Sequence, residues 1–517
     1  MRRGEKDNPI KSNYLEECDI PLEKFRIEPF TMVVFGGAGD LSQRKLLPTI
    51  YHLFVEGELP KDFSLIGFGL TEMSDRKYRD LIKEGVKKYR GEEFNDKKWK
   101  EFQKHLYYLS SPFEKDNNYK KLREKIKKIG IPVSKGNIEI IYYMAVPPKA
   151  TPIIVERLKN HGMCKEIFNT KIIVEKPFGW DRKSAVELNN ILLGAFEENQ
   201  IFRIDHYLAK ETVQNILFFR FSNSIFEPIW NSRNIDNVQI TAVESIGVGH
   251  RGKYYEQAGV VRDMVQNHIL QLVALVAMEV PVGLEADYIR DEKAKIFHSI
   301  RKMNEGHIDN FTVRGQYGSG SIDGKKAIGY REEKDVDENS NTPTFIAAKL
   351  FIDNWRWAKV PFYIRTGKRL SKKITEICIQ FKQPPLRLFG RTCEPLEPNV
   401  LILSIQPKER ISLKFGVKYP KEYNKIYPVY MDFSYQDEFK MKPHPPYERL
   451  LIDSMKGDLT LFIRQDSVKA MWEIVDPITG RWESNPPKDF PNYRAGTWGP
   501  EESSLLMQKE GRKWITR

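Results

Sequence analysis

The stretch RIDHYLAK, at residues 203–210, holds five side chains that carry charge or exchange protons. An arginine, an aspartate, a histidine, a tyrosine and a lysine in so short a run could form an ordinary solvated surface. The same set could hold an anion beside a proton acceptor, because histidine accepts protons near neutral pH and lysine binds phosphate as a compact charge. The stretch therefore indicates either a surface segment or a reactive site for an anionic substrate.

A second group that could do chemistry is the segment VVFGGAGDLSQRK, which places Gly36, Gly37 and Gly39 between an apolar run and a helical pattern. Glycines at such a junction permit a tight turn and let backbone N–H groups approach a pyrophosphate at the positive end of the helix. Ser42 occupies the third small position, where the helix passes close to the strand. With another apolar run at 63–69, this arrangement predicts dinucleotide binding rather than a plain turn.

The residues after that second run bear on the choice of cofactor. An acidic residue there hydrogen-bonds a ribose diol, whereas an arginine favours a 2′-phosphate. The chain has Leu70, Thr71 and Glu72 at this place, so the local sequence slightly favours NAD. Three basic residues nearby could still reach a phosphate: Arg44, Lys45 and Arg76.

The apolar runs that must position these residues predict two kinds of sheet. Near-continuous runs at 138–148 and 171–179, like those around the glycine turn, are typical of parallel strands covered on both faces. Beyond about residue 225, strand-like segments lie close together, at 237–245, 345–353, 361–367, 374–381, 399–407 and 411–417. We therefore expect a Rossmann-like, doubly wound α/β domain and an α+β domain with a large, mostly antiparallel sheet and its helices grouped on one side.

At 517 residues the chain is too long for one simple core, and its 40% hydrophobic content argues against global disorder. We expect residues 1–29 to be an N-terminal extension and 30–205 to form the dinucleotide-binding domain. Residues 206–517 then form an α+β domain for substrate binding and oligomerisation.

Charge and cysteine content narrow the possible partners. The net charge of +13 favours anionic partners, but basic residues alternate with 70 acidic ones and no nucleic-acid-binding motif is present. The longest apolar run, 269–278, is far shorter than the roughly 20 residues that span a membrane. The N-terminus lacks an apolar signal segment, and four cysteines without a C-x-x-C pair argue against zinc or a disulfide scaffold. We therefore expect a cytoplasmic protein that does not bind nucleic acid or membranes and has no metal site.

Further motifs identify a family. From VVFGGAGDLSQRKLLPTIY to AGTWGPEES, the chain resembles glucose-6-phosphate dehydrogenase over nearly its whole length. The shared motifs, in order, are AVPP, VEKPFG, RIDHYLAKETVQN, RDMVQNHILQ, RDEKAK, VRGQY, VPFYIRTGKRL and YERLLID. The resemblance implies an enzyme that oxidises the carbon-1 hydroxyl of glucose 6-phosphate to 6-phosphoglucono-1,5-lactone, the first step of the oxidative pentose phosphate pathway, with hydride delivered to NADP or, in some members, NAD.

Mapped by motif, the resemblance makes His268 the proton acceptor and Asp205 its orienting partner. It implies a set of substrate-binding residues: Lys176, His206, Tyr207, Lys210, Glu244, Asp263, Lys368 and Lys373. It also implies a set of cofactor-binding residues: Gly36, Gly37, Gly39, Asp40, Leu41, Leu70 and, again, Lys176. Lys176 precedes a proline that is often cis in this family.

Two positions depart from the family pattern. Leu70 stands where relatives usually have an arginine, and Ser110 and Ser111 stand where many bacterial relatives place an aspartate and an apolar residue near the adenine. Both departures leave the chemistry untouched and concern the cofactor, so we expect NADP, with NAD or dual use open because of Leu70.

Each site residue also has a structural interpretation. Asp205 could cap a helix at 207–221, and His268 could be a core histidine before an apolar helix. If a helix began near His206, then His206 and Lys210 would share a face one turn apart. The joint fit to the motifs favours the active-site interpretation. Two alternatives remain for the function of the whole chain: an inactive dinucleotide-sensing protein and a basic nucleic-acid-binding protein. If the chain is the enzyme, the resemblance implies a homodimer or homotetramer that associates through the large sheet.

Overall fold

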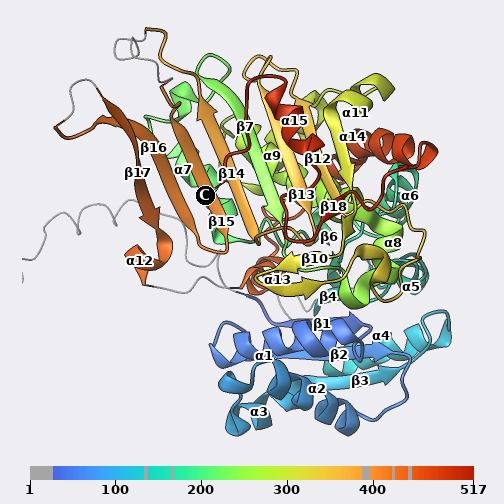
Figure 1. The fold of residues 1–517 in the computed structure, drawn as a ribbon. Coiled ribbons are helices and arrows are strands. Elements are labelled where there is room, and N and C mark those ends of the chain that lie inside the picture. The colour runs from blue at the N-terminus through green and yellow to red at the C-terminus, as the bar shows by residue number, and fades with distance from the viewer. Residues whose placement is uncertain are drawn as a thin grey trace, which may run out of the picture.

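Two sheets organise the molecule, one below the other in Figure 1. The computed structural model describes residues 27–132, 138–164, 168–386, 396–421, 425–440 and 445–516. The expected N-terminal extension therefore lies almost wholly outside the described residues, as do Cys18 and Cys393. Cys164 and Cys378 are buried free thiols.

The first sheet has six parallel strands in the order β3-β2-β1-β4-β5-β6. Its strands are β1 (Phe30–Phe35), β2 (Phe63–Gly69), β3 (Leu106–Ser110), β4 (Ile138–Met144), β5 (Phe168–Val174) and β6 (Ile201–Arg203). Every residue of β1 and β2 is buried, as the apolar runs predicted for strands covered on both faces. The order reverses between β1 and β4, so a crevice opens at the carboxyl ends of these two strands.

Helices connect these strands and cover the sheet. They are α1 (Leu47–Val55), α2 (Asp75–Tyr89), α3 (Asp96–Phe102), α4 (Asn117–Ile129), α5 (Ala150–Asn160) and α6 (Arg182–Leu193). Side chains fix three of the helix starts, because Ser74, Asn95 and Asp181 accept hydrogen bonds from backbone N–H groups of the first turns of α2, α3 and α6. The doubly wound domain is thus confirmed; the short strands β3 and β6 were not predicted.

The second sheet has eight strands in the order β17-β16-β15-β14-β7-β13-β12-β8. They are β7 (Ile235–Val243), β8 (Thr312–Gly315), β12 (Phe345–Phe351), β13 (Pro361–Gly367), β14 (Ile374–Phe381), β15 (Val400–Gln406), β16 (Arg410–Lys418) and β17 (Ile426–Ser434). All neighbours are antiparallel except β7 and β13, which pair in parallel. The mostly antiparallel sheet and six of its strands match the prediction, whereas β8 and β17 were missed.

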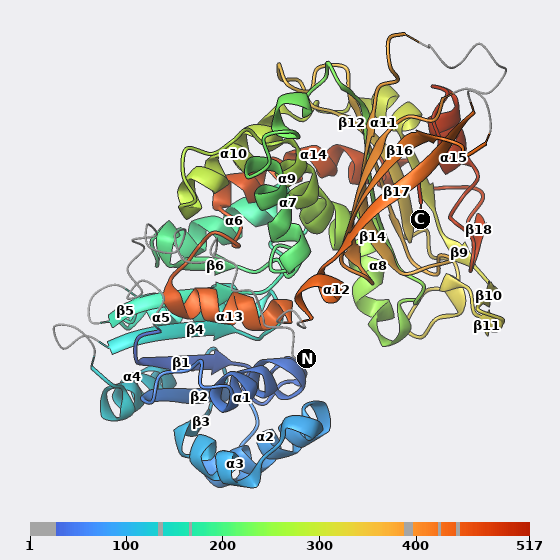
Figure 2. The ribbon, with the colours of Figure 1, turned by 90° about the vertical axis from the view of Figure 1, so that its left-hand side faces the viewer.

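Helices gather on one face of this sheet, as Figure 2 shows with the sheet nearly edge-on. On that side lie α7 (Glu211–Phe221), α9 (Leu270–Ala277), α10 (Ala286–Ser299) and α14 (Gln465–Ser484). The remaining helices are α8 (Gly252–Val260), α11 (Glu305–Phe311), α12 (Tyr435–Phe439), α13 (Pro446–Lys456) and α15 (Glu502–Gln508). Two small ribbons pair β9 (Tyr317–Gly318) with β18 (Tyr493–Arg494), and β10 (Gly320–Ile322) with β11 (Lys325–Ala327).

Helix α13 joins the two parts of the molecule. It lies beside the first sheet in Figure 2, and the Lys171 ammonium of β5 donates to the Met455 carbonyl at 2.8 Å. Arg90, at the end of α2, donates to the buried Glu448 carboxylate at 2.5 Å. Helix α13, which belongs to the last part of the chain, is therefore tied to the first sheet and its helices by polar contacts. None of the described helices has both the length and the apolar character that crossing a membrane requires.

Candidate active site

The carboxyl edge of the first sheet collects residues from four strands. The glycine turn follows β1, Ala145 follows β4, Lys176 follows β5 and Asp205 lies two residues beyond β6. Because parallel strands end at the same edge, these segments share one crevice, which is where open α/β sheets bind their ligands. The peptide between Lys176 and Pro177 is cis, as the family pattern implied.

The glycine turn is packed too tightly for other residues. Gly36 has a positive φ of 81°, and a Cβ on it would meet the Ala145 carbonyl oxygen at 2.2 Å. A Cβ on Gly37 would stand 2.5 Å from the Cα of Gly67 on β2. The Ser42 hydroxyl donates to the Gly36 carbonyl at 2.9 Å, so the small residue at this position closes the turn as expected. The turn is therefore held between β2 and β4 with its backbone at the helix start.

This geometry fits the pyrophosphate of a dinucleotide. A Cβ at Gly39 would come within 3.0 Å of the Gly36 oxygen and would fill the space in front of the helix start. The helix begins at Asp40 and Leu41 and continues through a π-helical turn, η3 (Ser42–Leu46), into α1. At the end of β2, Leu70 is 62% exposed. Ser111 lies beside that end, because its N–H donates to the Gly69 carbonyl.

A histidine and an aspartate form the centre of the crevice. His268 Nδ1 lies 2.5 Å from Asp205 Oδ1, and each side chain is about 1% exposed. The Tyr207 N–H donates to the same carboxylate oxygen at 2.9 Å. Because a carboxylate only accepts, Nδ1 carries the imidazole proton and Nε2 keeps its lone pair. Nε2 lies 2.8 Å from the Lys176 ammonium, which donates to it.

A π-helical segment positions His268. The segment η10 (Val261–Ile269) follows α8 after Gly259, whose φ of 59° interrupts the regular helix. In a π-helix residues five apart are bonded neighbours, so Asp263 and His268 face the same side. Lys176 contacts both, with its ammonium 3.7 Å from an Asp263 carboxylate oxygen. No sequence pattern indicated this π-helix, and an ordinary α-helix would turn these two residues apart.

Burial and charge keep the pair in the state that a general base needs. Burial alone would raise the pKa of Asp205, but the His268 ring and its hydrogen bond overcome this and hold the pKa below its ordinary range. Burial lowers the pKa of His268, partly offset by Asp205, and Lys176 lowers it further. Burial also lowers the pKa of His206 well below its ordinary value. At neutral pH His268 is therefore a neutral imidazole backed by a carboxylate.

The second sheet brings more charged residues to the same crevice. Val243 of β7 pairs in parallel with Gly367 of β13, so the residues that follow them, Glu244 and Lys368, emerge side by side. The Lys368 ammonium lies 2.5 Å from the Glu244 carboxylate and 3.8 Å from that of Asp263. Lys368 is 2% exposed, so it is no ordinary solvated lysine. The parallel pair β7 and β13 thus connects the second sheet to the dyad.

Lys210 and Lys373 form a basic corner of the crevice. The Lys210 ammonium donates to the Gln406 side-chain oxygen at 2.8 Å and lies 3.9 Å from the centre of the Tyr207 ring. Lys373 stands just before β14, whose first residue pairs with Val243. Desolvation lowers the pKa of Lys210 to about 8, with Asp205 opposing and Lys373 adding to the fall. Two cations within electrostatic range of each other favour the binding of a doubly charged anion.

Comparison with known proteins agrees with this arrangement. Residues 33–215 match the family model "Glucose-6-phosphate dehydrogenase, NAD binding domain", and residues 217–515 match "Glucose-6-phosphate dehydrogenase, C-terminal domain". The chain belongs to the glucose-6-phosphate dehydrogenase family. It is 43% identical over 495 residues to the glucose-6-phosphate 1-dehydrogenase of Chlamydia pneumoniae, covering 94% of this chain and 96% of that protein. It is 44% identical over 491 residues to the Aggregatibacter actinomycetemcomitans enzyme, covering 95% and 98%.

Solved structures of glucose-6-phosphate dehydrogenases share the fold. One, in complex with its substrate glucose 6-phosphate, superposes with a TM-score of 0.85 at 33% identity and covers 95% of this chain and 99% of that chain. The enzyme of Mycobacterium avium gives a TM-score of 0.80 at 33% identity, covering 94% and 99%. The family resemblance seen in the motifs is thereby confirmed.

The structure excludes two alternatives that the sequence left open for the RIDHYLAK segment. Helix α7 begins only at Glu211, and residues 206–209 form turns, so His206 and Lys210 do not share a helical face. Asp205 does not cap that helix, because its carboxylate accepts from the Tyr207 N–H and from His268. The aspartate instead closes a local turn, a conformation that competes with helix.

Arg203, the first residue of that segment, is structural. Its guanidinium is fully buried and forms a bidentate pair with Glu198 at 2.7 and 3.1 Å. It also donates to the Ile463 carbonyl, which ties β6 to the segment before α14. The segment RIDHYLAK therefore places Asp205 beside His268 and Lys210 beside Gln406, while its arginine holds β6 in place.

Sequence reasoning missed the role of Lys45. It was considered only for a 2′-phosphate, but its ammonium lies 4.2 Å from the centre of the Tyr447 ring. Tyr447 donates to Glu175, the residue before Lys176, at 3.1 Å. Desolvation lowers the pKa of Lys45 against a raising effect of Glu175. Lys45 therefore lies near His206 and Lys176, at the crevice, whereas its neighbour Arg44 pairs with Asp40 at the surface. In the sequence, only the position of Lys45 after the glycine turn hints at this.

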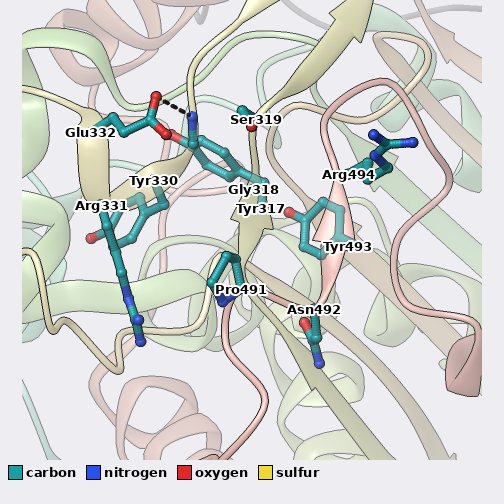
Figure 3. A pocket seen from close by; sticks show the side chains of 11 residues that line it. Tyr317, Gly318, Ser319, Tyr330, Arg331, Glu332, Pro491, Asn492, Tyr493 and Arg494 are labelled. Atoms are coloured by element: carbon teal, nitrogen blue, oxygen red, sulfur yellow. Dashed lines mark hydrogen bonds between the residues drawn. The ribbon is translucent and has the colours of Figure 1, made fainter.

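A separate pocket of about 460 Å³ is lined by the paired strands β9 and β18 and by residues 329–332 (Figure 3). The rings of Tyr317, Tyr330 and Tyr493 line it, and Arg331 and Arg494 point away from each other. Divergent cations do not clamp one anion. One residue of the pocket contacts a site residue: the Tyr493 hydroxyl donates to the Lys368 carbonyl at 2.8 Å. The pocket wall therefore supports the chain just after β13.

Proposed function

We propose that the protein oxidises glucose 6-phosphate at carbon 1 to 6-phosphoglucono-1,5-lactone, with NADP as hydride acceptor and NAD as a possible substitute. The observation that carries this proposal is the buried pair of His268 and Asp205 in the crevice next to the glycine turn. A basic corner at Lys210 and Lys373 lies within the same crevice. Family membership supports the same reaction, because the relatives named above are glucose-6-phosphate 1-dehydrogenases.

His268 acts as the general base. Its Nε2 accepts the proton of the carbon-1 hydroxyl, while Asp205 holds the Nδ1 proton and stabilises the imidazolium that forms. In the free protein the Lys176 ammonium donates to Nε2, so the substrate hydroxyl takes the place of this hydrogen bond. A bound nicotinamide supplies the hydride acceptor. Asp205, His206 and His268 could each offer one ligand atom to a metal ion, and these atoms lie within 4.8 Å of one another. Asp205 and His268 are hydrogen-bonded to each other, however, which favours proton transfer over metal binding.

Charged residues around the dyad hold the sugar phosphate. Lys210 and Lys373 face the phosphate with Tyr207, and His206 lies beside them, its ring centre 4.5 Å from that of His268. Glu244 and Asp263 accept hydrogen bonds from sugar hydroxyls. Lys368 contacts both carboxylates, so it fixes their orientation before the substrate arrives.

The glycine turn holds the dinucleotide. Gly36, Gly37 and Gly39 bring the backbone to the pyrophosphate, with Asp40 and Leu41 at the start of the helix. Leu70 leaves the end of β2 without the guanidinium that binds a 2′-phosphate in NADP. We therefore propose that NADP preference over NAD is weak in this protein.

Turnover tests the function directly. The parent protein is mixed with glucose 6-phosphate and either NADP or NAD, and the ultraviolet absorbance of the reduced nicotinamide is followed. We expect His268→Asn to lower kcat by about 10²–10⁴ while substrate binding persists. His161→Asn is the matched control, because His161 also pairs with an aspartate, Asp116 at 3.0 Å, away from the crevice. A parent protein that turns over with neither cofactor would make the chain a dinucleotide-binding protein without this activity.

We propose that two copies associate through the edge strand β17. Tyr427, Tyr430 and Met431 on this strand are 52%, 42% and 63% exposed. No described strand pairs with the outer edge of β17, and an edge with such side chains is a surface for a second copy. Sedimentation of the parent should show a dimer or tetramer at micromolar concentration, and Met431→Lys should shift it towards monomer. A parent that sediments only as monomer rejects this part. We also assign the protein to the cytoplasm, where buried free thiols such as Cys164 and Cys378 stay reduced.

A further inference from the structure

Helix α10 carries a buried lysine that the mechanism above does not use. The side chain of Lys293 is 2% exposed, and among the described residues its ammonium has no hydrogen bond and no ion pair within 4 Å. A buried ammonium is costly unless an anion compensates its charge. A buried lysine reduces this cost by giving up its proton more readily and by lying near a carboxylate.

The neighbours of Lys293 on α10 locate it relative to β6. Arg290, one helical turn before Lys293, donates to Glu198 at 3.4 Å. Glu198 holds the Arg203 guanidinium in a bidentate pair. Arg290 therefore lies next to Arg203, at the end of β6, and Lys293 lies one turn further along the same helical face.

Asp205 lies on the matching side of the chain. Residues two apart in an extended segment share a face, and the Ile204 N–H continues the strand ladder to the Val174 carbonyl. The Asp205 side chain therefore faces the same way as that of Arg203. Its Oδ1 receives the hydrogen bonds of His268 and Tyr207, whereas Oδ2 is buried and without a hydrogen-bond partner among the described residues.

The charges around Lys293 single out Asp205. Burial lowers the pKa of Lys293 to about 7, Arg290 lowers it further, and Asp205 is the first of the groups that raise it. The remaining charged groups that act on it are Arg464 and Asp466, at the start of α14, and these two pair with each other. The Lys293 ammonium therefore lies within electrostatic range of Asp205, whose Oδ2 has no hydrogen-bond partner among the described residues.

We propose that Lys293 is a positioning residue for the dyad: its buried ammonium lies near Asp205, on the side of the unpartnered Oδ2, and helps to hold Oδ1 turned to His268. Lys293 contacts neither substrate nor cofactor in this arrangement. The inference rests on the proposed function, because it assigns to Lys293 a role in the proton affinity of His268. The groups that face His268 itself are Asp205, His206, Tyr207, Lys176 and Asp263.

Lys293→Met removes the charge and keeps the length of the side chain. A cation near the dyad disfavours the imidazolium, so its removal raises the pKa of His268. The acidic limb of kcat/KM against pH should move to higher pH by about half a unit to one unit, since Lys293 acts without direct contact. At neutral pH kcat should fall, while the KM for glucose 6-phosphate should stay within about twofold.

Two further variants separate charge from structure. Lys293→Arg keeps the charge and should retain the parent pH profile, and Lys295→Met removes a lysine of the same helix whose side chain is 68% exposed and should change nothing. Thermal unfolding of each variant reports on folding. Two results overturn the proposal. One is an acidic limb of kcat/KM against pH in Lys293→Met that matches the parent; the other is an acidic limb in Lys293→Arg that is displaced as far as in Lys293→Met. If Lys293→Met does not fold, a displaced limb in Lys293→Arg rejects it and a parent-like limb supports it. Loss of activity in the parent would instead reject the proposed function.

Discussion

Lys210 offers the sharpest test of how the protein recognises its substrate. Its ammonium is held between the Tyr207 ring and the Gln406 side-chain oxygen, and it has no carboxylate partner among the described residues. Lys210→Met keeps the aliphatic stem over the ring and removes only the charge. A charge-assisted hydrogen bond contributes about 1.5–3 kcal/mol. The variant should therefore bind glucose 6-phosphate roughly 10- to 150-fold more weakly.

The pH dependence gives a second, independent signature. Desolvation lowers the pKa of Lys210 to about 8, so the free protein carries this charge below pH 8 and loses it above. Because a phosphate dianion binds the protonated amine, the KM for glucose 6-phosphate should rise as pH passes through 8. In Lys210→Met this rise should be absent, and the KM should already be high at pH 7.

Steady-state kinetics at several pH values measures both effects, with unphosphorylated glucose as the matched control substrate. Glucose lacks the anion that Lys210 binds, so the parent and Lys210→Met should use it with similar kcat/KM. Lys210→Arg should retain most of the affinity for glucose 6-phosphate. A KM for glucose 6-phosphate within twofold of the parent in Lys210→Met would refute the assignment of Lys210 to the phosphate. An equal loss with glucose would show that the variant disturbs the dyad instead.

Two further predictions concern the cofactor and the crevice. Leu70→Arg adds a guanidinium at the exposed end of β2. Because one charge-assisted hydrogen bond to the 2′-phosphate would then form, the ratio of kcat/KM for NADP to kcat/KM for NAD should rise by roughly 10- to 150-fold. An unchanged ratio contradicts our account of Leu70. Lys45→Met removes the ammonium that lies over the Tyr447 ring, and it should lower kcat/KM for glucose 6-phosphate about tenfold or more. Arg44→Met is its control, since Arg44 pairs with Asp40 at the surface, and equal losses in both variants would place Lys45 outside the active site.

Several elements followed directly from local sequence. Strands β1, β2, β4 and β5 are buried on both faces, so their apolar runs are continuous and easily recognised. The glycine turn was also predictable, because a positive φ at Gly36 and the close approach of Gly37 to β2 admit no side chain. The elements that were missed have weak patterns: β6 is three residues long, and β17 is a half-exposed edge strand that contains Pro428.

The pairing of residues across the chain needed the tertiary structure. The parallel contact between β7 and β13, which places Glu244 beside Lys368, joins segments more than a hundred residues apart by number. The π-helical segment that puts Asp263 and His268 on one side could not be predicted, because the sequence shows no apolar periodicity that distinguishes it from an α-helix. Lys45 and Lys293 carry no motif of their own, and only their surroundings distinguish them from solvated lysines.

By itself the sequence determined the two sheet types, the dinucleotide turn and, through its ordered motifs, the family, since these depend on local patterns of burial and on residues that tolerate no substitute. Only the tertiary structure decided which groups meet, because the His268 imidazole on η10 and the Asp205 carboxylate just beyond β6 are 63 residues apart and come together at 2.5 Å only in the folded chain. The protonation states that make the site reactive follow from that burial, which is a property of the folded chain.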